Sequence, residues 1–167
     1  MMPPDLSDNS DIAANHELAV KLISSARTMV LATCQGGAPW TAPVYYAYNA
    51  RQFCFFSSPQ AKHIKQAVNS KVAASIFFES PEWKEIQGLQ MTGRIIKIIK
   101  KTDIMKNTAL YLIKFPFAAL FLKASKSALK SHPNPTEKAS LFAFIPDKIY
   151  YLNNNLGFGT RQLIELI

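Results

Sequence analysis

The sequence predicts a mainly β protein, α+β by content, built as an antiparallel barrel of six to seven strands with peripheral helices. Short runs rich in Val, Ile, Phe, Tyr and Thr recur along the chain, as is typical of strands. Turns that contain glycine or asparagine separate the first three runs, which indicates hairpins. Strands and helices do not alternate regularly, so a doubly wound parallel sheet is disfavoured.

Size and composition indicate a single globular domain, 1–167, with residues 1–9 as a flexible arm. Apolar residues make up 49% of the chain and charged residues 18%, which is enough to build a core. The net charge of +8 favours an anionic partner, such as a phosphorylated cofactor, nucleic acid or a lipid surface. The polar, acidic start does not resemble a signal peptide. The longest apolar run, Leu110–Leu122, is too short to span a bilayer, so we expect a cytoplasmic protein.

Local patterns place the elements of the first half. Apolar residues recur every three or four positions from about Ser10 to Ala26, which predicts a helix. Pro43 cannot donate in a ladder, so it marks an edge, a bulge or a ligand-facing break. The other predicted elements here are strands at Thr28–Thr33, Pro39–Tyr48, Gln52–Ser57 and Val72–Phe78, and a short helix at Ala61–Val68.

The second half contains a long strand, a helical insertion and two late strands. Gly93 lies within the strand Leu89–Ile99 and predicts a bulge or a close backbone approach. A helix over residues 103–113 is expected, capped by Thr102 or Asp103. The remaining predicted elements are a helical piece from about Phe117 to Leu129 and strands at Ser140–Phe144 and Lys148–Asn153, separated by Pro146.

The corner after the third strand is the most informative segment. The apolar strand ends at Ser57 and Ser58, whose hydroxyls suit a helix cap, and Pro59 suits the first helical position. Two hydroxyls followed by Lys62 make a compact site for a phosphate. The alternative is an ordinary capped helix with a solvated lysine, and the spacing alone does not separate the two.

Groups for acid–base or metal chemistry are sparse. His16, His63 and His132 are scattered without metal-ligand spacing, and no hydrolase motif is present. Cys34 and Cys54 lie in apolar runs and are expected to be buried free thiols. Few acid–base groups beside a phosphate corner favour chemistry carried by a bound cofactor.

Three segments, APWTAPVYYAY, FFSSPQAKH and QGLQMTGR, follow one another in this chain. Their order and spacing resemble the FMN-binding split-barrel superfamily typified by pyridoxamine 5′-phosphate oxidase, and most closely a small bacterial subgroup whose members end like NN-x-GFG-x-R. The resemblance runs from about Glu17 to Leu166. It implies an antiparallel split β-barrel, FMN as the cofactor, and a homodimer with the flavin between two subunits.

The resemblance also implies roles for particular residues. Residues of the second strand would line the isoalloxazine, a group at the corner would take the phosphate, and two glutamines would reach the cofactor. The ring-lining residues are Trp40, Thr41, Ala42, Pro43 and Val44, the phosphate residues are Ser57, Ser58 and Lys62 with His63 beside them, and the glutamines are Gln87 and Gln90. Tyr151 and Arg161 match an aromatic–arginine spacing that serves the substrate. Tyrosine replaces the family's usual tryptophan, which argues against pyridoxamine phosphate as the substrate.

Two functions remain open from the sequence. The first is a flavin-dependent oxidoreductase that acts on a small molecule, with no nucleic acid expected as a partner. The alternative is a flavin- or haem-binding module without turnover. The insertion between Asp103 and Pro135 is rich in lysines and aromatics. It packs on the barrel, forms a groove for an apolar or anionic substrate, or contacts a membrane surface.

Overall fold

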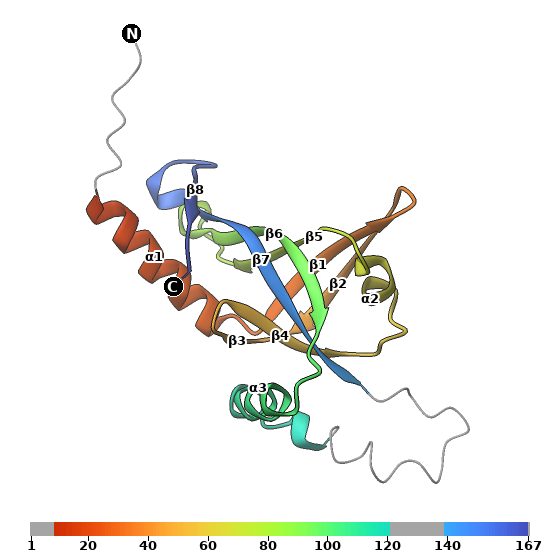
Figure 1. Ribbon diagram of the computed structural model, residues 1–167. Helices are drawn as coiled ribbons and strands as arrows, with labels where there is room; N and C mark the ends of the chain where they lie inside the picture. Colours follow the sequence, from red (N-terminus) through yellow and green to blue (C-terminus); the bar gives the residue numbers. More distant parts are fainter. Residues whose placement is uncertain (1–8, 121–138, 167) are drawn as a thin grey trace, which may run out of the picture.

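The computed structural model describes residues 9–120 and 139–166. Its strands form one antiparallel sheet that curls into a half-open barrel (Figure 1). The strand order is β2-β1-β5-β6-β7-β4-β3, and β8 pairs with β7. The predicted class, an antiparallel split barrel with peripheral helices, is confirmed, with seven strands on the main path. The elements are α1 (Asn9–Ser25), β1 (Thr28–Gln35), β2 (Ala38–Tyr45), β3 (Ala47–Asn49), β4 (Gln52–Ser57), α2 (Lys62–Ala67), β5 (Val72–Phe78), η1 (Trp83–Glu85), β6 (Gln87–Lys97), α3 (Lys101–Lys114), β7 (Ser140–Asn153), η3 (Asn154–Leu156) and β8 (Arg161–Ile164).

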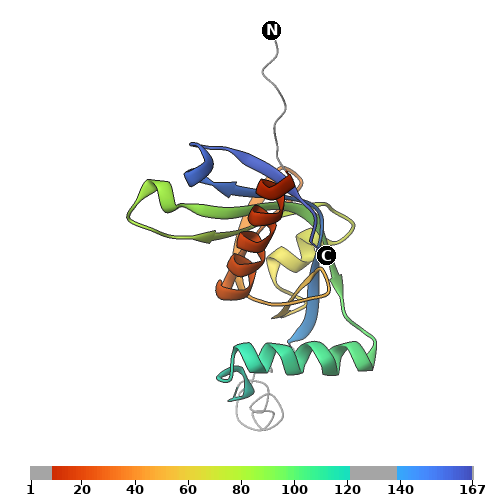
Figure 2. The same ribbon diagram turned by 90° about the vertical axis from the view of Figure 1, so that its left-hand side faces the viewer.

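The main core lies on the concave side of the sheet. In β1, Met29 and Leu31 are fully buried, whereas Val30 between them is only partly buried, because successive side chains point to opposite faces. Helix α1 covers one side of the barrel, as Figure 2 shows, and contributes Ala19 and Ile23 to the same core. On the opposite face of the sheet, Cys54, Leu141 and Ala143 are buried in a smaller cluster against which Ile104 of α3 packs.

The central pair β6–β7 contains an irregularity that the sequence anticipated in part. The register shifts between Thr92 and Gly93, as expected for a bulge at that glycine. A Cβ on Gly93 would overlap the carbonyl oxygen of Ile145 and would lie 2.8 Å from Cα of Pro146. The bulge accommodates Pro146 within β7, so the prediction of two strands separated at this proline is wrong and β7 is continuous.

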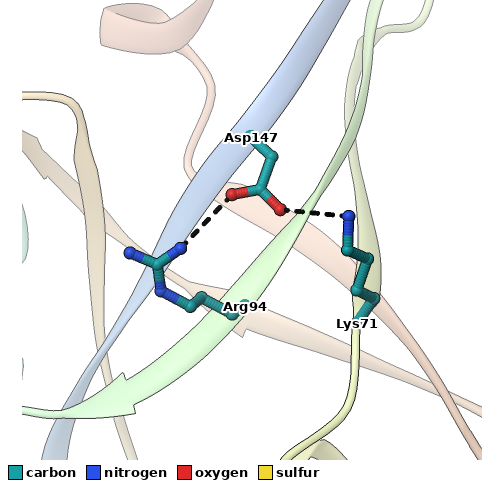
Figure 3. Close-up of polar contacts among 3 residues, drawn as sticks. All are labelled: Lys71, Arg94 and Asp147. Carbon is teal, nitrogen blue, oxygen red and sulfur yellow. Dashed lines mark hydrogen bonds and ion pairs between the residues drawn. The ribbon is translucent and has the colours of Figure 1, made fainter.

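An exposed ion-pair group joins β6, β7 and the residue before β5 next to the bulge (Figure 3). Asp147 lies 3.4 Å from the Arg94 guanidinium and 3.8 Å from the Lys71 ammonium. Both basic side chains are more than half exposed, so each pair contributes about 0–1 kcal/mol to stability.

Helix α3 lies across one end of the barrel and is anchored at its C-terminal part (Figures 1 and 2). Tyr111 and Phe115 form a small second core together with Ala47 of β3. Lys114 Nζ donates a hydrogen bond of 2.7 Å to the carbonyl oxygen of Ala26 and lies 4.2 Å from the centre of the Tyr46 ring. These contacts join the C-terminal ends of α1 and α3.

Several local predictions are corrected by the structure. Helix α2 begins at Lys62 with Ala61 as its N-cap, so neither serine caps it and Pro59 is not helical. Helix α3 has Lys100 at its N-cap position, in place of the predicted Thr102 or Asp103. Both cysteines are free, but Cys34 is exposed rather than buried.

Residues 1–8 of the predicted arm and most of the predicted helical piece at 117–129 lie outside the described residues, whereas Asn9, predicted as the end of the arm, begins α1. Within the described ranges, no helix has the length and hydropathy needed to cross a membrane.

Candidate functional site

The β4–α2 corner brings four of the predicted residues together in two contacts. Ser57 Oγ lies 3.0 Å from Nε2 of His63, and burial lowers the pKa of that histidine below its usual value. The Lys62 ammonium lies 4.2 Å from the centre of the Trp40 ring, at a distance typical of a cation–π contact. No carboxylate lies within ion-pair distance of Lys62 in the part of the chain that the structure describes. The ammonium therefore remains available to an anionic ligand.

A buried polar bridge fixes α2 at this corner, and sequence reasoning missed it. Thr33 Oγ1 donates a hydrogen bond of 2.7 Å to Gln66 Oε1, and Gln66 Nε2 donates one of 3.2 Å to the carbonyl oxygen of Ala38. Only 4% of Thr33 and 5% of Gln66 are exposed to solvent. The inward position of Thr33 on β1 was a signal, but nothing local paired it with a glutamine 33 residues away.

Strand β2 is an edge of the sheet, as the position of Pro43 suggested. Prolines are tolerated on edge strands where the missing N–H would face solvent. Pro39 and Pro43 are four residues apart, which indicates that the backbone of these positions, and of Thr41 midway between them, faces the open edge. Thr41 retains its N–H, so it supplies a donor to that edge between two residues that cannot.

An open trough of about 480 Å³ lies on the convex face of the sheet, across β2, β1, β5, β6 and β7. Thr41 and Gln90, both predicted site residues, line it. None of its lining residues is charged, although the chain as a whole carries +8. The lining residues are Val30, Ala32, Thr41, Ala73, Ala74, Ser75, Gln90, Met91, Thr92 and Tyr150.

The other predicted residues form two hydrogen-bonded pairs on β6, β7 and β8. The Tyr151 hydroxyl donates a hydrogen bond of 2.7 Å to Gln87 Oε1. Arg161 Nε donates one of 2.8 Å to Gln90 Oε1, and its Nη1 donates to the carbonyl oxygen of Gly159 at 3.0 Å. Tyr151 and Arg161 also line a cavity of about 320 Å³. The amide of Gln90 therefore connects the arginine with the trough.

The structure thus arranges the predicted residues in two groups. The corner holds Trp40, Ser57, Lys62 and His63, and the convex face holds Thr41, Gln90 and Arg161. Across residues 9–120 and 139–166, no side-chain hydrogen bond or ring contact joins these groups. Ala42 and Val44 point inward from β2 to the core. The same ranges contain no group of three or more His, Cys, Asp or Glu that could hold a metal ion.

A curled antiparallel sheet, with a cation at one strand-to-helix corner and an uncharged trough on its convex face, defines a split-barrel protein. The family model described as pyridoxamine 5′-phosphate oxidase matches residues 16–129, and the chain belongs to that family. This confirms the resemblance found in the sequence.

Three relatives show how far the similarity extends. UPF0306 protein plu4501 of Photorhabdus laumondii is 23% identical over 150 residues, which cover 88% of this chain and 93% of that protein. A heme binding protein from Mycobacterium smegmatis matches with a TM-score of 0.64 at 15% identity, covering 98% of this chain and 59% of the other. A FAD-binding protein from Mesorhizobium loti matches with a TM-score of 0.59 at 15% identity, covering 81% and 91%. At these identities the structural matches establish the fold.

Proposed function

We propose that the protein binds FMN as a homodimer, with the phosphate at the β4–α2 corner and the flavin ring along the open edge of β2. The observation that carries this proposal is the uncharged trough beside that edge. A flat, mostly apolar ring can lie there without desolvating a charge. The family membership and the FAD-binding neighbour support a flavin as the cofactor.

The corner fits a phosphate group. The Lys62 ammonium faces an aromatic ring rather than a carboxylate, so a dianion gains a charge-assisted hydrogen bond without breaking an ion pair. The hydroxyl of Ser57 lies beside His63, and Ser58 follows it in the chain. Gln66 holds α2 against the β1–β2 hairpin, so Lys62 and Trp40 keep their relative positions.

The edge and trough fit the rest of the cofactor. The N–H of Thr41 and the carbonyl groups of the neighbouring prolines offer one donor and several acceptors to the polar edge of the ring. Gln90 can both donate and accept through its amide, which suits ribityl hydroxyls or ring atoms. The Arg161 contact orients this amide, because Oε1 accepts the arginine and leaves Nε2 to donate elsewhere.

A second copy of the chain would complete the site. The trough is open to solvent in one copy and lacks charged residues, as is typical of surfaces that become buried in obligate interfaces. The partner would cover the ring and exclude water. Burial of the ring by the partner would distinguish this site from a surface that binds a free nucleotide weakly.

When bound, the flavin supplies hydride exchange, and we propose that the protein acts as an oxidoreductase on a small molecule. The chain's own residues bind and orient. Tyr151 and Arg161, which line a common cavity, are placed to hold an anionic substrate or an anionic part of the cofactor. Arg161 would offer its planar cation, and Tyr151 its ring edge.

A binding module without turnover is the second candidate. The heme binding neighbour has the same fold, and apart from Tyr150 the residues lining the trough have no titratable side chain. Such a protein would hold flavin or haem tightly and would transfer no electrons to or from tested donors.

The first experiment is an absorbance spectrum of the purified protein followed by titration with FMN. Lys62→Ala should weaken FMN binding by about 1.5–3 kcal/mol, roughly 10- to 150-fold, because a charged contact to the phosphate is lost. Lys65→Ala is the matched control, since Lys65 is an exposed lysine on the same helix. Equal loss in both variants, or no loss in either, would remove the phosphate from this corner.

A second experiment separates the two candidates. Reduced nicotinamide added to the FMN-loaded protein should bleach the flavin bands if the protein is a reductase. Haemin that displaces FMN, together with no bleaching by any donor, would favour the binding module. Sedimentation of the loaded protein tests the dimer, and a monomer with FMN bound would exclude a shared site.

A further inference from the structure

The solvent-facing side of α3 carries an apolar stripe that is largely exposed in the described part of the chain. Met105, Ala109 and Ile113 recur every four residues, so they lie on one face of the helix. Met105 is 65% exposed and Ile113 is 76% exposed. Asn107 and Tyr111, which are buried, lie on the opposite side. The helix therefore packs on the barrel through one face, and its opposite face carries apolar side chains that stay exposed.

Exposed lysines surround this stripe. Lys97 ends β6, Lys100 and Lys101 begin α3, and Lys106 lies one residue beyond Met105, all of them exposed. The ion pairs found within residues 9–120 and 139–166 all involve Asp147, so these lysines have no carboxylate partner there. Asp103 is the single acidic residue between Lys97 and Lys114. The local charge is thus strongly positive and unneutralised.

A lysine-lined cavity lies at the start of the same helix. It measures about 350 Å³ and lies between the β3–β4 turn, the end of β6 and the first turns of α3. Lys97, Lys100 and Lys106 line it together with the carboxylate of Asp103, polar amide side chains and isoleucines of β6 and the segment that follows it. Asn49 Nδ2 donates a hydrogen bond of 2.8 Å to Asn107 Oδ1, which ties the β3–β4 turn to the helix and keeps the cavity in shape.

We propose that this surface docks on an anionic lipid bilayer. Met105 and Ile113 would enter the boundary between headgroups and acyl chains, and the exposed lysines at the end of β6 and the start of α3 would meet the anionic headgroups. Ile99 and Leu120, which are 81% and 71% exposed, extend the apolar surface beyond both ends of the helix. Figure 2 shows α3 at one end of the barrel, on the far side of the sheet from the start of α1.

The charge decides between a bilayer and a second copy of the chain. Two copies meeting through α3 would bring two unneutralised lysine clusters together within proteins that each carry +8. An anionic bilayer reverses this, since each lysine near its surface gains about 1 kcal/mol, or roughly fivefold in binding. The stripe is also convex and narrow, as in helices that lie in a membrane interface.

The test is co-sedimentation of the full chain with vesicles of phosphatidylcholine alone or with added phosphatidylglycerol. We expect binding to the anionic vesicles that falls as salt rises, and little to the neutral ones. The double variant Met105→Glu, Ile113→Glu should lower the partition coefficient at least tenfold. Lys100→Gln, Lys101→Gln and Lys106→Gln together should lower it by about 100-fold, at fivefold per lysine.

Val68→Glu is the matched control, because Val68 is an apolar residue outside α3 that is 64% exposed, close to the value for Met105. It should leave vesicle binding unchanged. No binding of the wild-type chain, or binding that the stripe variant keeps, would overturn the proposal. Concentration-dependent self-association that Met105→Glu abolishes would assign the stripe to a second copy instead. Circular dichroism of each variant shows that a loss is not caused by unfolding.

Discussion

Replacing Gly93 with alanine tests whether the bulge in the β6–β7 pair is required by the packing. The added methyl group would overlap the carbonyl oxygen of Ile145 and lie 2.8 Å from Cα of Pro146. Both are backbone atoms, so a side-chain rotation cannot relieve the contact. The strands themselves must separate, in a pair that joins eleven residues of β6 to β7 at the centre of the sheet.

The magnitude follows from this geometry. Overpacking against movable side chains costs about 1–3 kcal/mol, so a clash with two backbone segments should cost about 3 kcal/mol or more. For a chain of this size that corresponds to a fall in Tm of about 6–12 °C. Urea unfolding followed by circular dichroism measures the free energy directly, and calorimetry measures Tm.

Gly88→Ala on the same strand is the control. A Cβ there would lie 3.3 Å from the carbonyl oxygen of Ile76, which a small shift can relieve, so the cost should stay near 1 kcal/mol. If Gly93→Ala is no worse than Gly88→Ala, the close approach of β7 at Pro146 does not exist in solution, and the continuous β7 strand must be reconsidered.

Three further outcomes are expected. Burial and the neighbouring Arg27 lower the pKa of Lys114 to about 8. Between about pH 8 and pH 10 the unfolded chain keeps a proton that the folded chain has released, so the free energy of unfolding should rise with pH. Lys114→Met should abolish that rise in urea titrations. Gln66→Ala should destabilise the fold by about 1–3 kcal/mol in the same assay, because it leaves the buried Thr33 hydroxyl unpaired. A thiol reagent should modify exposed Cys34 in the native protein, whereas Cys54, which is fully buried with its pKa raised by burial to about 11, should react only after unfolding.

Much of the fold could be predicted because the signals are local. Hairpin turns, period-two burial and the glycine at the bulge all act between neighbours in the sequence, and β1, β4, β5 and β6 lie where those signals placed them. The predicted helix caps were wrong because general preferences did not decide where each helix begins. Serines and a proline before α2 satisfy the general preferences for a helix start, but Ser58 Oγ instead accepts the N–H of Gln60 and forms a turn ahead of the helix.

The candidate site could be predicted only as a set of residue types. Spacing placed Lys62 and Trp40 on different elements, and it gave no indication that the ring would lie under the ammonium. The Arg161–Gln90 contact spans 71 residues and depends on how β8 pairs with β7. Such contacts follow from the sheet order, which no local pattern encodes.

The two prolines of β2 have a consequence for how molecules of this protein meet. An exposed edge strand can pair with a strand of another chain, and aggregation can begin in this way. Pro39 and Pro43 lack backbone N–H groups, so an added strand would find few hydrogen-bond donors on the free edge of β2. The edge of β2 therefore disfavours strand addition by other chains. A small planar ligand that needs only one backbone donor can still bind there through the Thr41 N–H.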